Sequence, residues 1–159
     1  MTLANAFGSG FNKDSLRIRT FVLNNNTFKV KVPLTAETEA MFDRIRNVDE
    51  AKAEEHYKKL SDEFFTNRDK YADDPDIEYL ENDIKVKGIS VRETASNKVM
   101  TENRITEMVR LLVPESPDFD MSQITYQDID DLFPFSVQME LVDEIANIIS
   151  PTYKPTRGK

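Results

Sequence analysis

The N-terminal part of the chain alternates apolar and polar residues. Apolar and basic side chains alternate over 16–22 and again over 27–32, and a period of two is typical of β-strands. Three consecutive asparagines, beginning at Asn24, separate the two runs, and asparagine tolerates the left-handed backbone of a tight turn. The pattern predicts a β-hairpin over 16–32. Its outer face is expected to be basic and to carry Arg17, Arg19, Lys29 and Lys31.

Apolar residues at helical spacing dominate the chain from 36 to 150. Asn47 and Glu50 match a capping box, which either starts a new helix or lies within one long helix. The fold class predicted is mainly α: an N-terminal β-hairpin followed by a compact bundle of about four to six helices. In the segment that follows Thr125, Ile129 and Leu132 are expected to point inward.

Three regions of different character divide the chain. Residues 1–15 contain Asn, Gly and Ser without a regular period, which predicts a flexible N-terminal arm. Residues 16–150 are expected to form a single globular domain, because the chain of 159 residues has the length of one domain. Residues 151–159 contain further prolines and basic residues and are predicted to be a disordered basic tail.

Charge is distributed unevenly along the sequence. The net charge is −8, and 111–153 contains nine acidic residues but no Lys or Arg. The basic hairpin over 16–32 is complementary to this acidic segment. The two could meet within one molecule, between copies in a homo-oligomer, or on a partner protein.

Candidate chemistry is sparse. The only histidine, His56, lies among charged residues and is predicted to be a solvated surface side chain, and there is no cysteine. No nucleophile motif, metal-ligand pattern or phosphate loop is present, so no catalytic residue, cofactor or metal is expected. The net negative charge opposes binding to nucleic acid, and no apolar run is long enough to cross a membrane.

The last predicted helix carries more apolar residues than one packing surface needs. These residues either belong to the core or form a protein-binding face, and nearby acidic side chains would rim such a face. The candidate partner-binding residues here are Phe133, Phe135, Met139, Val142, Asp128, Asp130 and Asp131. The basic hairpin residues Arg17, Arg19, Lys29 and Lys31 complete the candidate set.

Three stretches give the chain a resemblance to a known family. They are Arg19 to Asn24 followed by Thr27 to Thr35, Gly88 to Ala95 with Thr101 to Met108, and Leu132 to Val142 (LFPFSVQMELV). With these motifs the sequence resembles the tail assembly chaperones of long-tailed siphophages. The motifs are packing and capping patterns and include no catalytic signature.

The resemblance implies a small, mostly helical and non-catalytic protein. Members of the family hold the tape measure protein soluble and recruit tail tube subunits in the cytoplasm of the infected bacterium, and they are absent from the mature virion. The family also implies a longer product made by translational frameshifting, for which Gly158 and Lys159 offer a G-then-A codon run. The alternative is a structural minor tail or connector protein that stays in the phage particle.

Overall fold

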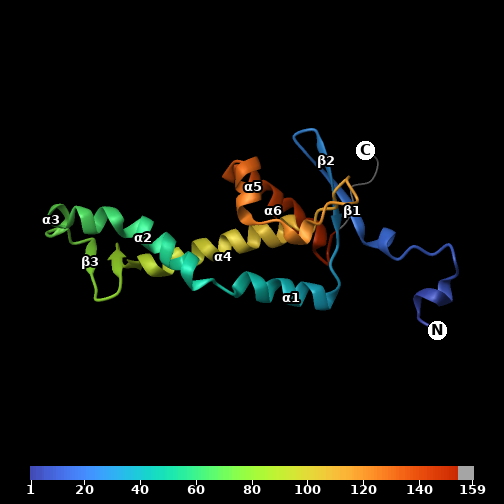
Figure 1. Ribbon diagram of the computed structural model, residues 1–159, viewed down its shortest axis with the longest axis horizontal. Coiled ribbons are helices and arrows are strands. Elements are labelled where there is room, and N and C mark those ends of the chain that lie inside the picture. Colours follow the sequence, from blue (N-terminus) through green and yellow to red (C-terminus); the bar gives the residue numbers. More distant parts are fainter. Residues whose placement is uncertain (154–159) are drawn as a thin grey trace. The chain divides into compact units, whose positions relative to one another are not determined.

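The structure, a computed structural model, describes residues 1–153 and confirms the mainly α fold with an N-terminal β-hairpin (Figure 1). The hairpin consists of β1 (Ile18–Leu23) and β2 (Asn26–Lys31). A second sheet has the strand order β3 (Ile77–Tyr79), β4 (Ile84–Val86), β5 (Ile89–Ser90). Within residues 1–153 there are six α-helices: α1 (Thr35–Arg46), α2 (Glu50–Thr66), α3 (Arg68–Tyr71), α4 (Val91–Val109), α5 (Tyr126–Leu132) and α6 (Phe135–Ile149).

The turn of the first hairpin is the one that its asparagines predict. Asn24 and Asn25 have φ of 50° and 66°, in the left-handed region that this two-residue turn requires. Strand pairing is antiparallel, with Phe21 opposite Phe28, and the two rings stack with centroids 5.2 Å apart. The two-residue turn at Asn24 and Asn25 therefore sets the register of the hairpin.

The register corrects the prediction of one basic face. Directly opposite residues lie on the same face of an antiparallel pair. Arg19 is opposite Val30, whereas Lys29 is opposite Thr20 and Lys31 is opposite Ile18. Arg19 therefore shares the face of the buried Val30, and the two lysines lie on the other face. Alternation within each strand could not reveal this difference, because it depends on how the two strands are aligned.

The chain divides into two compact units. The first, here called the hairpin unit, comprises Met1–Phe42 and Ile105–Lys159, and the second, the central unit, comprises Asp43–Arg104. Helices α1 and α4 contribute residues to both units. Each unit has buried apolar side chains of its own.

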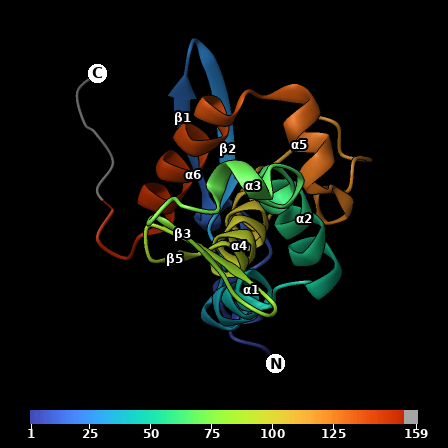
Figure 2. The same ribbon diagram turned by 90° about the vertical axis from the view of Figure 1, so that its left-hand side faces the viewer.

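The core of the hairpin unit is built on α6. Leu141, Ile145 and Ile148 are buried along one side of α6, as the helical spacing predicts, and β1 packs against this helix (Figure 2). The chain after α4 also pairs with β2: the Lys31 N–H donates to the Leu111 carbonyl at 2.9 Å, and the Val113 N–H donates to the Lys29 carbonyl at 2.8 Å. Segment 111–113 therefore covers the outer edge of β2.

The central unit has a smaller core beside the β3–β4–β5 sheet. Tyr57, Ile84, Val91 and Ala95 are buried together, and half-buried apolar side chains surround them. Lys87 and Gly88 have positive φ, of 52° and 80°, in the two-residue turn between β4 and β5.

The break between α1 and α2 settles one alternative left open by the sequence. Two helices are present, and the N-cap of α2 is Asp49, whose carboxylate accepts from the Lys52 N–H at 3.1 Å. The predicted pair of Asn47 and Glu50 is therefore not the capping box. Asp49 has the extended backbone that an N-cap needs, with φ −69° and ψ 117°.

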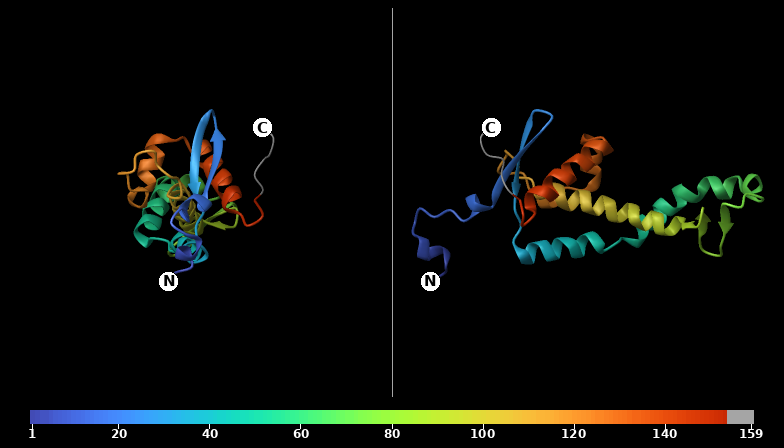
Figure 3. Two further views of the ribbon diagram at one scale, coloured as in Figure 1. Left: turned by 90° about the vertical axis from the view of Figure 1, so that its right-hand side faces the viewer. Right: turned by 180° about the vertical axis from the view of Figure 1, so that it is seen from behind.

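The two ends of the chain lie outside the long helices. Residues 1–15 form short 3₁₀ turns and have no buried side chain, and Figure 3 shows this arm running away from the hairpin. Pro151 to Tyr153 follow α6 as a turn. The rest of the predicted tail, including the proposed frameshift position at 157–159, lies outside the described residues.

Candidate protein-binding surface

The corner between α5 and α6 is held by local capping. The Thr125 hydroxyl accepts from the Asp128 N–H at 3.3 Å, and the Asp128 carboxylate accepts from the Thr125 N–H at 2.8 Å. This reciprocal capping box satisfies two backbone donors at the start of α5. Pro134 is the N-cap of α6 and provides no side-chain cap. The corner is thus defined on one side by hydrogen bonds and on the other by proline.

A fully buried amide joins the two helices at this corner. The Gln138 Nε2 group donates to the Asp130 carboxylate and to the Phe133 carbonyl, both at 2.9 Å. The Gln138 Oε1 atom accepts from the Tyr126 hydroxyl at 2.9 Å. Both donors and the acceptor of this side chain are satisfied, which is what a buried polar group requires. Gln138 therefore fixes α5 against α6, a role that the sequence pattern did not suggest.

The apolar residues of the corner differ widely in exposure. Leu132 and Phe135 are 71% and 56% exposed, whereas Val142 is only 2% exposed. The inward orientation predicted for Leu132 is wrong, because Ile129 alone fills the inner side of this short helix. Phe133 and Met139 are half-buried. The apolar surface at the corner is thus made mainly by Leu132 and Phe135, and Val142 belongs to the core.

Three acidic side chains lie on α5, the helix that ends at Leu132, and each also has a local structural role. Asp128 completes the capping box, Asp130 accepts from Gln138, and Asp131 accepts from the Gln127 Nε2 group at 2.6 Å. All three residues are exposed. Their carboxylates are therefore oriented by hydrogen bonds and still accessible to a basic partner. Leu132, Phe135, Asp128, Asp130 and Asp131 are here called the corner patch.

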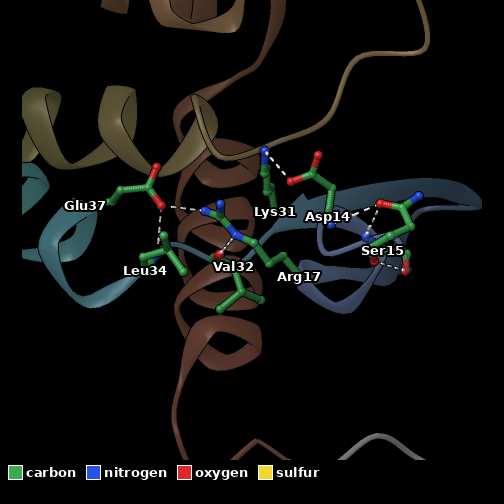
Figure 4. A network of polar contacts seen from close by, with 8 residues as sticks. Asp14, Ser15, Arg17, Lys31, Val32, Leu34 and Glu37 are labelled. Carbon is green, nitrogen blue, oxygen red and sulfur yellow. Dashed lines mark hydrogen bonds and ion pairs between the residues drawn. The ribbon is translucent and has the colours of Figure 1, made fainter. Parts of the chain in front are cut away.

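Two of the hairpin bases, Arg17 and Lys31, are paired with acids inside the hairpin unit (Figure 4). An Arg17 Nη group donates to the Glu37 carboxylate at 2.5 Å, and its Nε group donates to the Val32 carbonyl at 2.8 Å. Lys31 Nζ lies 3.6 Å from the Asp14 carboxylate. The backbone N–H of Leu34 holds the pKa of Glu37 below its usual range, and Arg17 acts in the same direction. These ion pairs use acids outside 111–153, so they do not follow the predicted pairing.

The other two hairpin bases differ from each other. The Arg19 guanidinium donates to the Ile148 carbonyl near the end of α6, where helical carbonyls lack intrahelical partners. It also lies over the ring of Tyr153, 5.0 Å from the centroid. Lys29 is exposed. Arg19 is thus a structural contact between β1 and α6, and Lys29 is the more accessible base.

The environment of His56 corrects the prediction of a solvated surface residue. Its side chain is 16% exposed, and its Nε2 atom lies 2.8 Å from the Glu102 carboxylate on α4. The neighbours of His56 in sequence are charged, but its side chain packs between helices of the central unit. Within the described residues, Nδ1 of His56 has no hydrogen-bond partner. No nucleophile is placed beside the ring by these contacts, so they support no catalytic role.

A depression of about 440 Å³ in the central unit is lined by charged and polar residues together with Val48 and Ala53. Its Arg92 lies over the Tyr57 ring, 3.8 Å from the centroid, and pairs with the Glu54 carboxylate at 2.6 Å. The hydrogen bond from Arg92 lowers the pKa of Glu54. Because Arg92 is already committed to these contacts, the depression offers no free cation for a ligand.

Residues 1–153 contain neither a metal-binding cluster nor a membrane-spanning helix. No group of three or more His, Asp or Glu side chains in this range is arranged to hold a metal ion. None of the helices in the same range is both long and apolar enough to cross a membrane. In comparisons with known proteins, the sequence matches no family model, no curated protein and no solved structure.

Proposed function

We propose that this protein is a tail assembly chaperone of a long-tailed siphophage. It binds the tape measure protein and recruits tail tube subunits during tail morphogenesis in the cytoplasm of the infected bacterium, without catalysis. The observation that carries the proposal is the corner patch, where two large apolar side chains remain exposed beside three oriented carboxylates. Exposed apolar residues with a polar rim are typical of protein-binding sites.

The position of the patch in the sequence adds support. Leu132 and Phe135 both lie in the stretch 132–142 that carries the resemblance to the chaperone family. This stretch also supplies Gln138, which holds the corner, and Leu141, which anchors α6 in the core. One short motif thus supplies both the exposed apolar residues and the groups that keep them in place.

The charges of the patch suggest the chemistry of the partner segment. An apolar client segment with flanking Lys or Arg would bury Leu132 and Phe135 and pair with Asp128 or Asp131. Charge pairs at such a rim favour association but are weakened by salt. A chaperone for a long, aggregation-prone client benefits from this arrangement, because the acids keep the complex soluble.

Co-expression with the tape measure protein of the same phage tests the proposal. We expect the client to remain in the soluble fraction with the wild-type protein and to precipitate with the double variant Leu132→Ser and Phe135→Ser. The matched control is Leu16→Ser with Phe119→Ser, because these residues are 72% and 54% exposed and lie outside the patch. Equal client solubility with both double variants would refute the role of the patch.

Mass spectrometry of purified virions separates the proposal from its alternative. A chaperone is expected in lysates of infected cells and absent from purified particles. Detection in the particle at the stoichiometry of a tail component would instead identify a structural minor tail or connector protein.

A further inference from the structure

The two long edges of the hairpin differ in whether another segment of the hairpin unit is hydrogen-bonded to them. The edge of β2 is covered, because Lys29 and Lys31 form backbone hydrogen bonds with segment 111–113. The residues opposite these lysines in β1 are Thr20 and Ile18. Because these lysines bond to 111–113, the pairs Thr20–Lys29 and Ile18–Lys31 are not hydrogen-bonded to each other. In an antiparallel sheet, both residues of such a pair direct their N–H and C=O groups away from each other. The N–H and C=O groups of Thr20, and of Val22 two residues further on, therefore point to the outer edge of β1.

This outer edge is open along Thr20 and Val22. In the described part of the chain, β1 pairs only with β2, and no backbone hydrogen bond joins Thr20 or Val22 to another segment. Thr20 is exposed and Val22 is 63% exposed. The tip of the hairpin projects beyond α6 in both panels of Figure 3. At the other end of β1 the Ile18 N–H is already used, because it donates to the Ser15 carbonyl.

The edge lacks the proline and the bulge by which proteins often block strand addition, and its one charged side chain, Arg19, lies on the face of the buried Val30. Natural edges carry a proline, a bulge or an outward charge, whereas β1 is regular from Ile18 to Leu23. The side chains on its outer face are those of Ile18, Thr20 and Val22, all β-branched and thus favourable for pairing. A depression of about 450 Å³, lined by Ile18, Arg19, Thr20 and Tyr153, continues from this edge.

The geometry points to a site on the β1 edge for an extended acidic segment of a partner protein, which adds as a third strand. Acid is favoured because the depression beside this edge holds the Arg19 guanidinium, which contacts a backbone carbonyl and an aromatic ring but no carboxylate of the described residues. The inference is independent of the corner patch and of the chaperone proposal.

The pattern of the partner strand follows from the two faces of β1. A neighbouring strand lies about 4.8 Å away, and its side chains alternate between the faces. Apolar β-branched side chains are expected beside Ile18, Thr20 and Val22. Acidic side chains are expected on the opposite face, beside Arg19, whose guanidinium has further donors besides the one that contacts Ile148.

A short synthetic peptide provides the test. The probe is an acetylated and amidated peptide of sequence Thr-Glu-Val-Glu-Val-Glu-Val-Glu-Thr, and binding to the full-length protein is measured by fluorescence anisotropy. We expect Thr20→Pro to weaken binding about tenfold or more, because proline removes an outward N–H group and its ring blocks the edge. The N–H group of Thr20 makes no bond to β2, so the hairpin itself is expected to persist.

Thr27→Pro is the matched control. Thr27 is exposed, lies in the same hairpin opposite Val22, and directs its backbone groups to the edge of β2 rather than to that of β1. This variant is expected to bind the peptide like the wild type. A peptide with Lys in place of Glu is expected to bind at least about tenfold more weakly, and equal binding would refute the acidic specificity.

Hydrogen exchange keeps the test valid if a proline variant fails to fold. In the wild-type protein, the amides of Thr20 and Val22 are expected to exchange rapidly alone and to become protected with the peptide, whereas the Thr27 amide is unchanged. Absence of peptide binding, or binding without this protection, would overturn the inference. Self-association of the wild type that Thr20→Pro abolishes would assign the edge to a second copy and would overturn it equally.

Discussion

The hairpin unit and the central unit are stabilised by different kinds of interaction. Most of the large, fully buried side chains belong to the hairpin unit, and they include Leu141, Ile145 and Ile148 on α6. The central unit has fewer of these and depends more on charged groups that bridge its elements, among them Asp83 and Arg92. A unit with a larger apolar core needs fewer polar side chains to hold its fold, so more of its surface residues can bind a partner. A unit with a small core uses its polar side chains to hold the fold.

Asp83 shows how the central unit is held. Its carboxylate accepts hydrogen bonds from the Ile84 N–H at 2.7 Å, from the Arg92 N–H at 3.0 Å and from the Ser90 hydroxyl. These bonds connect β4, β5 and the first turn of α4. The Ser90 hydroxyl also accepts from the Glu93 N–H at 3.1 Å, which caps the start of α4. In the central unit, hydrogen bonds to one carboxylate thus connect elements that in the hairpin unit are held together by aliphatic packing.

The largest effect is expected from a cavity in the core of the hairpin unit. Leu141 has no exposed surface, so Leu141→Ala removes buried methyl groups and leaves a void. We expect the free energy of unfolding to fall by about 3 kcal/mol in urea denaturation. The control is Leu16→Ala on the exposed side of the same unit, which is expected to have almost no effect. A loss below about 1 kcal/mol for Leu141→Ala would contradict the importance of the α6 core.

Removal of the Asp83 carboxylate is expected to have the next largest effect. In Asp83→Ala, the N–H groups of Ile84 and Arg92 lose their acceptor, which should cost about 2 kcal/mol. Hydrogen exchange should increase first in 77–95, and α6 should retain its protection. Asp73→Ala, an exposed aspartate of the same unit, is the control. Uniform loss of protection in both units would contradict the proposed contrast.

Acid should destabilise the central unit through the same residue. Burial raises the pKa of Asp83, but the Ser90 hydroxyl and the backbone N–H groups of Arg92 and Ile84 lower it more, and the net pKa is depressed. The stabilisation is therefore complete above the unfolded pKa, about 4, and is lost as the pH falls through the lower folded pKa. Urea denaturation between pH 5 and about pH 2.5 should show a steeper loss in the wild type than in Asp83→Asn. An equal loss of stability with falling pH in the wild type and in Asp83→Asn would exclude Asp83 as the cause of the acid destabilisation.

The smallest effect is expected at the exposed network of the hairpin unit. Glu37→Gln weakens the contact with Arg17 and the acceptor of the Leu34 N–H at the start of α1. The expected loss is about 0.5 kcal/mol, because exposed ion pairs contribute little. Glu39→Gln on the same helix is the control, since Glu39 is also exposed. A loss above about 2 kcal/mol would mean that the hairpin unit depends on polar contacts as strongly as the central unit does.

Much of the fold follows from local patterns in the sequence. Asn24 and Asn25 specify the hairpin turn, and the spacing of Leu141, Ile145 and Ile148 specifies the buried side of α6. The orientation of Leu132 was predicted incorrectly, since a helix of seven residues has room for few inward positions and Ile129 occupies that side. The contact of His56 with Glu102 joins residues 46 positions apart, and no periodicity within one helix can indicate it.

The candidate surfaces, too, were predicted in part from local sequence and in part could be found only in the structure. The sequence identified the acidic segment 111–153, the basic hairpin and the apolar stretch at the start of α6. It could not distinguish Phe135, which is exposed, from Val142, which is buried, because both are apolar and their exposure depends on what packs against α6. It also could not show that Arg17 is paired with Glu37 or that the edge of β1 is open.

The sequence by itself determined the first hairpin and the long helices, because turn residues, helix spacing and caps act over a few neighbouring positions. It did not predict the β3–β4–β5 sheet, which lies within the stretch 36–150 that was expected to be helical. Only the tertiary structure decided which charges are neutralised, which apolar side chains stay exposed and which strand edge lacks a partner. These properties depend on residues far apart in the chain, such as Lys29 with Val113 and Arg19 with Ile148. The surfaces proposed to bind partners consist of side chains and backbone groups that these long-range contacts leave exposed.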